Sequence, residues 1–222
     1  MKVLITGTTG MVGKGVLLEC LESNIITKIT VVNRKSLNLK HTKLEEILHQ
    51  DFLDFDSIQN QLSEYDACFH CMGVSSVGMD EKQYTKLTFS ITKSLVNTLY
   101  KKNPNMVFNY VSGTGTDSSE TGKTMWARVK GKTENLILNK GFKDAYMFRA
   151  GAIIPEKGVK SSTGWYNILY IIFRPLFPLM KKMQSITTSS RLGIAMINSI
   201  QANQDLKLLE NVDINNLAKL KF

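Results

Sequence analysis

The sequence predicts an α/β fold: a doubly wound parallel sheet with a small, mostly helical C-terminal lobe. Two observations lead to this prediction. Short apolar runs alternate with amphipathic stretches along residues 1–151, and a glycine-rich loop follows the first apolar run directly. Strands that are separated by helices need right-handed crossovers, which place helices on both faces of a parallel sheet. The 222 residues, 43% of them hydrophobic, are enough for one substantial core but not for two large domains.

Each expected element follows from its pattern of apolar residues. The short apolar runs predict strands over residues 2–6, 28–33, 44–50, 66–72, 105–112 and 145–151. The amphipathic stretches predict helices over residues 11–23, 55–64, 80–102 and 124–140. Acids begin the third of these helices and lysines end it, as the helix dipole favours, and Gly141 follows the fourth.

The pattern changes after Gly151. Residues 164–183 and 189–201 are expected to be helical, and residues 206–220 close the chain. We therefore expect residues 1–151 to form a sheet domain. Residues 152–222 are expected to form a small substrate or lid lobe that is interleaved with the sheet domain and not independent of it.

Residues 164–180 form a strongly apolar stretch of this lobe. Arg174, Pro175 and Pro178 interrupt the stretch, and it is too short to span a bilayer. It can wall a substrate pocket, or it can expose an apolar, lysine-flanked surface to a membrane or a partner. The pocket is the favoured interpretation.

The composition limits the choice of partner and location. A formal net charge of +9 favours nucleic acids, anionic membranes or phosphate-bearing ligands. However, no run of Lys and Arg is longer than two and no stripe interleaves basic with aromatic residues, so a nucleic-acid partner is not expected. The N-terminal apolar run is too short for a signal peptide, which predicts a cytoplasmic location.

The cysteines are predicted to be reduced and structural. Cys20, Cys68 and Cys71 are an odd and sparse set. Cys68 and Cys71 form a CxxC pattern, but they lie in an expected buried strand. Residues three apart on a strand point to opposite faces and are ~10 Å apart, too far for a disulfide. A second pair of zinc ligands is also missing, so no metal site is expected.

Gly7, Gly10 and Gly13 follow the first expected strand and open the first expected helix. This context makes the spacing a strong signal for a Rossmann-type dinucleotide site. Glycine permits a tight turn, lets the backbone approach a phosphate and lets the helix pack close to the sheet. The backbone N–H groups that would face a pyrophosphate belong to Thr9, Gly10, Met11 and Val12.

The end of the second expected strand favours NADPH over NADH. An NAD site usually has an acidic residue there, which accepts hydrogen bonds from the ribose hydroxyls. Here Asn33 ends the strand, and Arg34 and Lys35 follow it. Two cations would attract a 2′-phosphate. The alternative is that these residues are only a solvated basic loop.

Further motifs occur at the ends of later strands: "HQDF" after the third, "CMG" after the fourth, "VSGTG" after the fifth, and "WARVKGKTEN" in the next helix. With the glycine loop, they resemble the short-chain dehydrogenase/reductase superfamily, in its atypical, extended branch of NAD(P)H-binding and epimerase-like proteins. The resemblance covers about residues 1–155 well. It implies that Asp51 and Phe52 flank the adenine, that Cys71, Met72 and Gly73 line the ribose side, and that Ala150, Gly151, Ala152 and Ile153 pass near the nicotinamide.

The resemblance also implies a catalytic set of a Ser or Thr after the fifth strand and a YxxxK motif in the next helix. Ser112 and Lys130 match this set, but Trp126 stands where the tyrosine should be. Lys130 is then expected to bind the nicotinamide ribose. The family's tyrosine supplies a proton as hydride moves. An indole N–H donates a hydrogen bond but does not titrate usefully, so Trp126 cannot replace that acid.

Three hypotheses follow from this substitution. The protein is an oxidoreductase whose proton comes from a water, from Lys130 or from a hydroxyl of Thr114, Thr116 or Thr124. Or it binds NADPH without turnover and reports redox state to a partner. Or Trp126 stacks on a flat substrate or the nicotinamide in an epimerase or isomerase, although the C-terminal lobe is small for a nucleotide sugar. A hydrolytic triad has no support, because His41, His49 and His70 fall in an expected loop or in strands.

Overall fold

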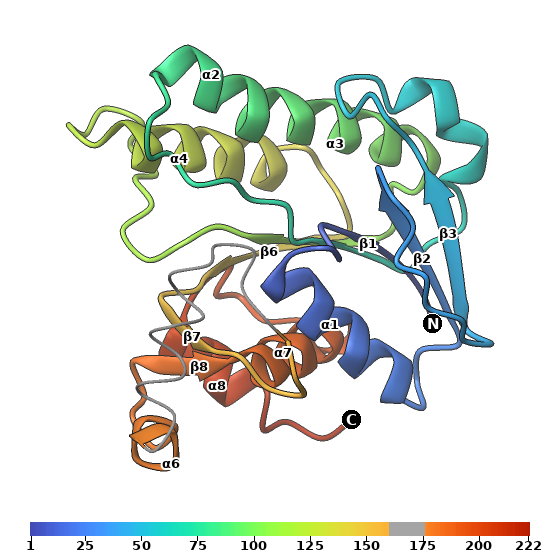
Figure 1. Cartoon of the computed structure of the whole chain (residues 1–222). Coiled ribbons are helices and arrows are strands. Elements are labelled where there is room, and N and C mark those ends of the chain that lie inside the picture. The colour runs from blue at the N-terminus through green and yellow to red at the C-terminus, as the bar shows by residue number, and fades with distance from the viewer. Residues whose placement is uncertain (160–175) are drawn as a thin grey trace.

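A parallel sheet of seven strands forms the centre of the computed structural model, which describes residues 1–159 and 176–222 (Figure 1). The strands are β1 (Lys2–Thr6), β2 (Lys28–Asn33), β3 (Leu44–Leu48), β4 (Ala67–His70), β5 (Val107–Val111), β6 (Asp144–Arg149) and β9 (Leu208–Glu210). Their order is β3-β2-β1-β4-β5-β6-β9, and every pairing is parallel. The order reverses between β1 and β4, where sheets of this kind open a crevice at the carboxyl ends of the strands.

Helices cover both faces of the sheet. The helices among the described residues, not all of which cover the sheet, are α1 (Met11–Glu22), η1 (Asp56–Gln61), α2 (Glu81–Thr85), η2 (Lys86–Ser90), α3 (Ile91–Lys102), α4 (Met125–Leu138), α6 (Phe177–Met180), α7 (Ser189–Ala202) and α8 (Asn211–Leu217). Figure 1 shows α2, α3 and α4 over one face and α1, α7 and α8 over the other. The predicted doubly wound Rossmann-type fold is thus confirmed. No helix among the described residues has the length and apolar character needed to cross a membrane.

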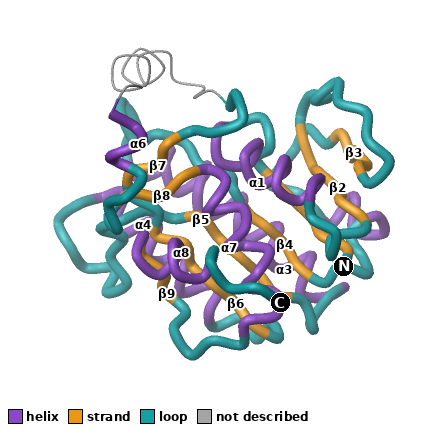
Figure 2. The backbone as a smooth tube through the Cα atoms, turned by 90° about the horizontal axis from the view of Figure 1, so that it is seen from below, coloured by secondary structure: helices purple, strands orange, loops and turns teal. Residues whose placement is uncertain are grey.

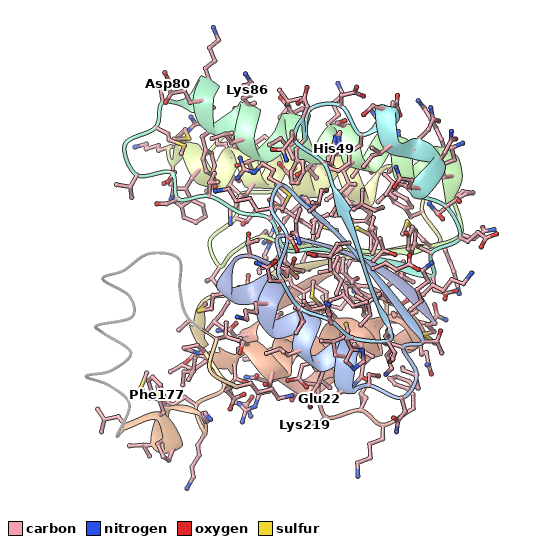
Figure 3. All side chains as sticks on the ribbon, turned by 45° about the vertical axis from the view of Figure 1, so that its right-hand side comes forward. Glu22, His49, Asp80, Lys86, Phe177 and Lys219 are labelled. Carbon is pink, nitrogen blue, oxygen red and sulfur yellow. The ribbon has the colours of Figure 1, made fainter. Side chains whose placement is uncertain are left out.

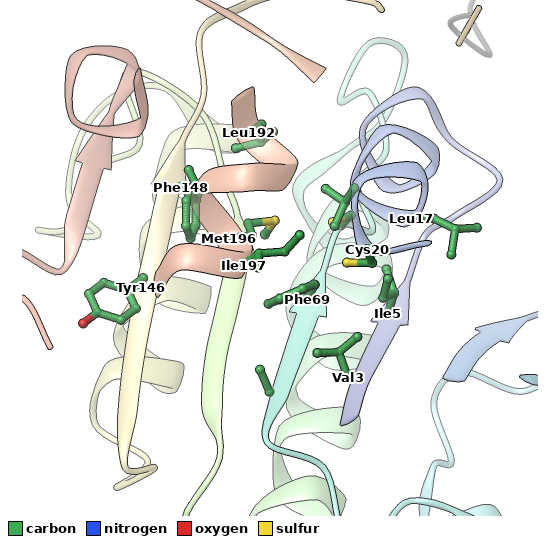
Figure 4. Packing of buried hydrophobic residues seen from close by; sticks show 14 of the residues in the cluster. Val3, Ile5, Leu17, Cys20, Phe69, Tyr146, Phe148, Leu192, Met196 and Ile197 are labelled. Carbon is green, nitrogen blue, oxygen red and sulfur yellow. The ribbon is translucent and has the colours of Figure 1, made fainter. Parts of the chain in front are cut away.

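The sheet separates two hydrophobic cores because alternate side chains of each strand point to opposite faces. Val3, Ile5 and Phe69 pack with Leu192 and Met196 of α7 on one face (Figure 4). On the other face, Leu4 and Cys68 pack with side chains of α3 and α4. The inner strands are buried on both faces, which explains their continuous apolar runs.

The cysteines follow the same division. Cys68 belongs to the core between the sheet and the helices α3 and α4. Cys71 and Cys20 belong to the core between the sheet and the helices α1 and α7. All three thiols are free and buried. The prediction that the CxxC residues lie on opposite faces is confirmed.

The helix predicted over residues 80–102 is one helical column with a change of winding in the middle. Asp80, labelled in Figure 3, caps its start by accepting a hydrogen bond from Gln83 N at 2.7 Å. The η2 segment has π-helical winding between α2 and α3. Within it, Thr88 O accepts a 2.6 Å hydrogen bond from the hydroxyl of Thr92. A side-chain donor that occupies a helix carbonyl in this way competes with the backbone ladder.

Residues after Gly151 contribute both to the sheet domain and to a small lobe. β9 pairs with β6 at the sheet edge, and α7 packs beside α1. Figure 2 shows α7 and α8 lying over the sheet strands. A separate two-stranded ladder is formed by β7 (Ala152–Ile154) and β8 (Ile186–Thr188). The sequence did not predict β7, β8 or β9, because three residues are too few to show an alternation.

The apolar stretch over residues 164–180 lies largely outside the described residues. Only its end, from residue 176 through α6, is described.

Candidate functional site

The glycine loop joins β1 to α1 at the carboxyl edge of the sheet. Gly7 has φ of 78°, and a Cβ on it would lie 2.6 Å from Cys71 O. A Cβ on Gly13 would lie 2.3 Å from Gly7 O. Both glycines are therefore required by the protein's own packing. Gly10 is different, because among the described residues a Cβ there would meet only Gly7 O, at 3.4 Å.

The N-terminus of α1 has the properties of an anion site. Its N-cap, Gly10, makes no side-chain cap, and its first turn contains no acidic residue. The first N–H groups of a helix lack intrahelical acceptors and carry the positive end of the helix dipole. The absent side chain of Gly10 leaves space above them, where Gly7 O, at 3.4 Å, is the one atom of the described residues within 4 Å of a Cβ. A pyrophosphate fits these features, and the loop therefore fits a dinucleotide.

Two alanine substitutions should separate folding from binding in this loop. Gly13→Ala should destabilise the protein by about 1–3 kcal/mol or more, because its Cβ would overlap the backbone of Gly7. Gly10→Ala should change the stability by less than about 1 kcal/mol, since Ala is only a poorer N-cap than Gly. It should nevertheless weaken NADPH binding at least about tenfold, as a methyl group would occupy the phosphate's place.

Urea denaturation and calorimetric titration of both variants provide the measurements. Normal NADPH binding by Gly10→Ala would show that the phosphate does not approach this residue.

The end of β2 brings together the residues predicted to bind the adenosine part. Arg34 is exposed, and its guanidinium carbon lies 5.9 Å from the centre of the Phe52 ring. His49, labelled in Figure 3, stacks on Phe52, with ring centroids 6.0 Å apart. Gln50 fixes the chain here by donating to Arg34 O at 2.7 Å. Among the described residues, no carboxylate pairs with Arg34.

Other predicted cofactor residues lie at the same edge of the sheet. Lys35 is exposed beside Arg34, and Asp51 is exposed and accepts a hydrogen bond from Leu53 N at 2.9 Å. Cys71 and Met72 lie against Gly7, and no atom of the part of the chain that the structure describes lies within 4 Å of the place where Gly73 would carry a Cβ. These positions agree with a ligand that runs along the carboxyl ends of β1, β2 and β4.

Asn33 is a polar residue that the sequence did not assign to the site. It is 3% exposed, and its Oδ1 accepts a hydrogen bond from Thr8 Oγ1 at 2.9 Å. Its Nδ2 has no hydrogen-bond partner among the described residues. The Asn33 amide nitrogen can only donate and its oxygen already accepts from Thr8, whereas the carboxylate of a typical NAD site is acceptor-only.

Lys130 belongs to α4, and its side chain reaches the end of β5, where the sequence predicts the nicotinamide. Its Nζ donates to Ser112 O at 2.8 Å. Burial lowers the pKa of Lys130 to about 8, because desolvation disfavours the ammonium form, and the nearby Glu134 opposes part of that effect. Lys130 is thus a cation that can release a proton close to neutral pH.

Ser112 faces this lysine with its carbonyl, while its hydroxyl is engaged elsewhere. Ser112 Oγ donates to Glu134 Oε1 at 2.6 Å. Glu134 is fully buried and forms an ion pair with Arg149, with an Nη2–Oε2 distance of 2.6 Å. Sequence reasoning missed Glu134. Its only signal was its position four residues after Lys130 on the same helix face.

Trp126 lies one turn before Lys130 at the start of α4 and is partly exposed. Its ring atom Cη2 lies 3.6 Å from the place where a Cβ on Gly115 would be. Gly115 has φ of 84°, so it belongs to the left-handed turn of the loop after β5. The indole therefore packs over this loop beside Lys130. The family that the sequence resembles has its tyrosine at this position.

The segment after β6 closes this end of the site. Ala150 O lies 3.8 Å from the place of a Cβ on Gly113, which in turn is 3.6 Å from Lys130 Nζ. Gly151 donates its N–H to Asn211 Oδ1 at 3.1 Å. Ala152 and Ile153 continue into β7. The residues predicted from β5, α4 and β6 thus meet around Lys130.

A separate groove of about 620 Å³ lies at the amino edge of the sheet. It is lined by the N-terminus, by the start of β1 and the end of α3, and by the residues before β2, β4 and β5: Met1, Lys2, Thr27, Ser63, Glu64, Tyr65, Asp66, Lys102, Asn103, Pro104, Asn105 and Met106. None of the predicted site residues lines it. The carboxyl edge remains the candidate site, because the glycine loop, Arg34 and Lys130 all lie there.

Residues 3–213 match the model of the NAD-dependent epimerase/dehydratase family. The chain belongs to this family. It is an atypical short-chain dehydrogenase/reductase-like protein that binds a nicotinamide cofactor and has an oxidoreductase- or epimerase-like role. The resemblance predicted from the motifs is confirmed.

Curated relatives and solved structures agree with this assignment. Protein HTATIP2 of Rattus norvegicus is 24% identical over 222 residues, which cover 98% of this chain and 89% of that protein. The mitochondrial protein FMP52 of Candida albicans is 25% identical over 171 residues, or 75% of this chain and 72% of that protein. The UDP-N-acetylglucosamine 4-epimerase from Bacillus cereus has the same fold, with a TM-score of 0.67 and 16% identity over 97% of this chain and 83% of that structure. The uronate dehydrogenase from Agrobacterium tumefaciens reaches a TM-score of 0.68 at 14% identity, over 94% and 75% of the two chains.

Proposed function

We propose that the protein binds NADP(H) and acts as an oxidoreductase or epimerase-type enzyme on a small molecule, with Lys130 in place of the usual acid. The observation that carries this proposal is the position of Lys130: a desolvated ammonium at the end of β5, next to Trp126 and to the segment after β6. Bound NADP(H) would supply or accept the hydride. Lys130, Ala150, Gly151, Ala152 and Ile153 would line its nicotinamide end.

Lys130 suits the task of moving a proton at its Nζ. An efficient general acid has a pKa near the working pH, and the pKa of Lys130 is lowered to about 8. Its hydrogen bond to Ser112 O holds the side chain in one place. Trp126 lies one helical turn away, and its indole ring provides a flat, partly exposed surface on which a substrate or the nicotinamide can stack.

The preference for NADPH is supported by the end of β2. Arg34 is exposed and unpaired within the described part of the chain, it lies over Phe52, and no acid takes the ribose position. A guanidinium binds phosphate through strong, charge-assisted hydrogen bonds. The 2′-phosphate of NADPH would accept hydrogen bonds from Arg34, whereas NADH has no phosphate at that position.

Arg34→Gln should weaken NADPH binding by about 1–3 kcal/mol, which is the scale of a charge-assisted hydrogen bond. NADH binding should stay the same, since NADH lacks the 2′-phosphate. Calorimetric titration of both cofactors gives the two affinities. Lys102→Gln is the matched control, because it removes an equal charge from an exposed residue of α3 at the amino edge of the sheet. An equal loss for both cofactors, or an equal loss in the control, would contradict a specific role of Arg34.

A non-catalytic role is the second candidate, and two observations favour it. Trp126 provides no acid, and the hydroxyl of Ser112 is held by Glu134. A protein with such a site can bind NADPH without turnover and report redox state through a protein partner.

Trp126→Tyr tests whether the missing tyrosine limits the reduction of simple carbonyl compounds. We expect the wild type to consume NADPH at or near background with simple aldehydes and quinones. The variant should gain activity, because a phenol next to an ammonium has a lowered pKa and general acids typically contribute about 10²–10⁴-fold in rate. Trp126→Phe is the control that removes the indole without adding a hydroxyl.

The outcomes of this comparison differ clearly. Efficient wild-type turnover that is lost in Trp126→Tyr would show that the indole belongs to a working site. Intact NADPH binding without turnover in any of the three proteins would favour the non-catalytic role.

A further inference from the structure

Asn211 connects three segments of chain that are distant in the sequence. It is the first residue of α8, directly after β9, and is 5% exposed. Its Oδ1 accepts the N–H of Gly151 at 3.1 Å, and its Nδ2 donates to Ala152 O at 3.3 Å and to Ser185 O at 2.6 Å. One amide side chain therefore ties the turn between β6 and β7 to the residue before β8 and to the sheet edge.

The residue before it holds the neighbouring loop in a similar way. The hydroxyl of Thr114 lies 2.9 Å from Glu210 Oε2 and 3.0 Å from Arg149 O, and these two acceptors share its single hydrogen. Gly151 lies between these groups: a Cβ on it would be 3.0 Å from Thr114 Oγ1 and 3.3 Å from Asn211 Nδ2. The end of β9 thus fixes both loops that surround Lys130.

We propose that Asn211 is a positioning residue, which holds Gly151 and Ala152 in the place that receives the nicotinamide half of the cofactor. The inference rests on the proposed function, in which residues 150–153 line that half. It assigns a role to a residue that is 60 positions away from its partner in the sequence and that belongs to no motif.

The same helix provides a matched comparison. Asn215 lies one turn after Asn211 and is 3% exposed. Its Nδ2 donates to Gln184 O at 3.2 Å and to Ile186 O at 2.9 Å. Asn215 therefore fastens β8 to α8 as Asn211 does, but none of these hydrogen bonds reaches Gly151 or Ala152.

Asn211→Asp and Asn215→Asp test the proposal. Each keeps the size of the side chain and removes the donor that serves two carbonyls. Asp is also favoured at the first residue of a helix, so α8 should still form in Asn211→Asp. Calorimetric titration measures the affinity of each protein for NADPH and for adenosine 2′,5′-bisphosphate, which lacks the nicotinamide half. Asn211→Ser, a shorter neutral variant, replaces Asn211→Asp if the latter does not fold.

We expect Asn211→Asp to weaken NADPH binding about tenfold or more, which corresponds to about 1.4 kcal/mol, and to leave the bisphosphate affinity unchanged. Asn215→Asp should leave both affinities unchanged. Unchanged NADPH binding in Asn211→Asp, or an equal loss for both ligands, would overturn the positioning role while the proposed function stands. Wild-type protein that binds neither ligand would instead refute the proposed function, and with it the proposal for Asn211.

Discussion

Replacing Glu134 by Gln should lower the free energy of unfolding by about 3–5 kcal/mol, the usual loss when one partner of a buried ion pair is neutralised. Glu134 is fully buried, and its carboxylate accepts hydrogen bonds from Ser112 Oγ and from Nε and Nη2 of Arg149. Gln keeps the size of the side chain but leaves the guanidinium without a counter-charge. Urea denaturation at neutral pH measures the loss.

Glu81→Gln is the control for this prediction. Glu81 pairs with Arg128 at 2.7 Å, almost the same distance, but its side chain is 53% exposed. An exposed pair contributes about 0–1 kcal/mol, so this variant should be nearly as stable as the wild type. Replacing Glu134 and Arg149 together by Met should recover part of the loss, because no unpaired charge remains. Similar losses for Glu134→Gln and Glu81→Gln would show that burial of the pair has no special effect.

Lys130→Met should have opposite effects on stability and on function. In the folded protein the pKa of Lys130 is about 8, below its ordinary value of 10.5. The unfolded chain therefore binds more protons between these two pH values, and wild-type stability rises with pH in that window. Below pH 8 the wild type carries the full cost of the buried charge, which Met does not have. We expect the variant to be more stable than the wild type at pH 7, by about 1–3 kcal/mol since one pKa unit is about 1.36 kcal/mol, and to bind NADPH more weakly.

The pH dependence is the decisive part of this prediction. The stability advantage of Lys130→Met should shrink as pH rises from about 8 towards 10.5, because wild-type Lys130 loses its proton in the folded state. Urea denaturation at several pH values measures this difference in the free energy of unfolding between the variant and the wild type. Lys132→Met, on an exposed residue of the same helix, should show no such pH-dependent difference. A constant difference between Lys130→Met and wild type would mean that this lysine is not desolvated.

Local patterns predicted the parts of the molecule that depend on neighbouring residues. The alternation of apolar runs predicted β1 to β6, α1 and α4, and the glycine spacing predicted the turn before α1. Arg34 and Phe52 could be assigned to one site because parallel strands end at the same edge of the sheet. The helical repeat likewise places Trp126 and Lys130, four residues apart, on one face of α4.

The sequence could not predict contacts that depend on side-chain choices between distant segments. Ser112 matched the family's motif, but its hydroxyl donates to Glu134, 22 residues away. The hydrogen bond between Asn211 and Gly151 joins residues that are 60 positions apart in the sequence. Asn211 directly follows β9, a strand of only three residues. The π-helical segment η2 also lay inside an ordinary helical pattern, since winding depends on contacts such as that between Thr92 and Thr88. No periodicity encodes these interactions.

Binding of NADPH and NADH to the wild-type protein at one salt concentration is the most direct test of the account, because it needs no substrate. Calorimetric titration gives both affinities. Arg34 beside Phe52, the helix that begins at the glycine N-cap Gly10 and the lysine near the end of β5 predict that NADPH binds at least about tenfold more tightly than NADH. Equal affinities for the two cofactors would contradict the role of Arg34. Absence of binding to either would contradict the cofactor site itself.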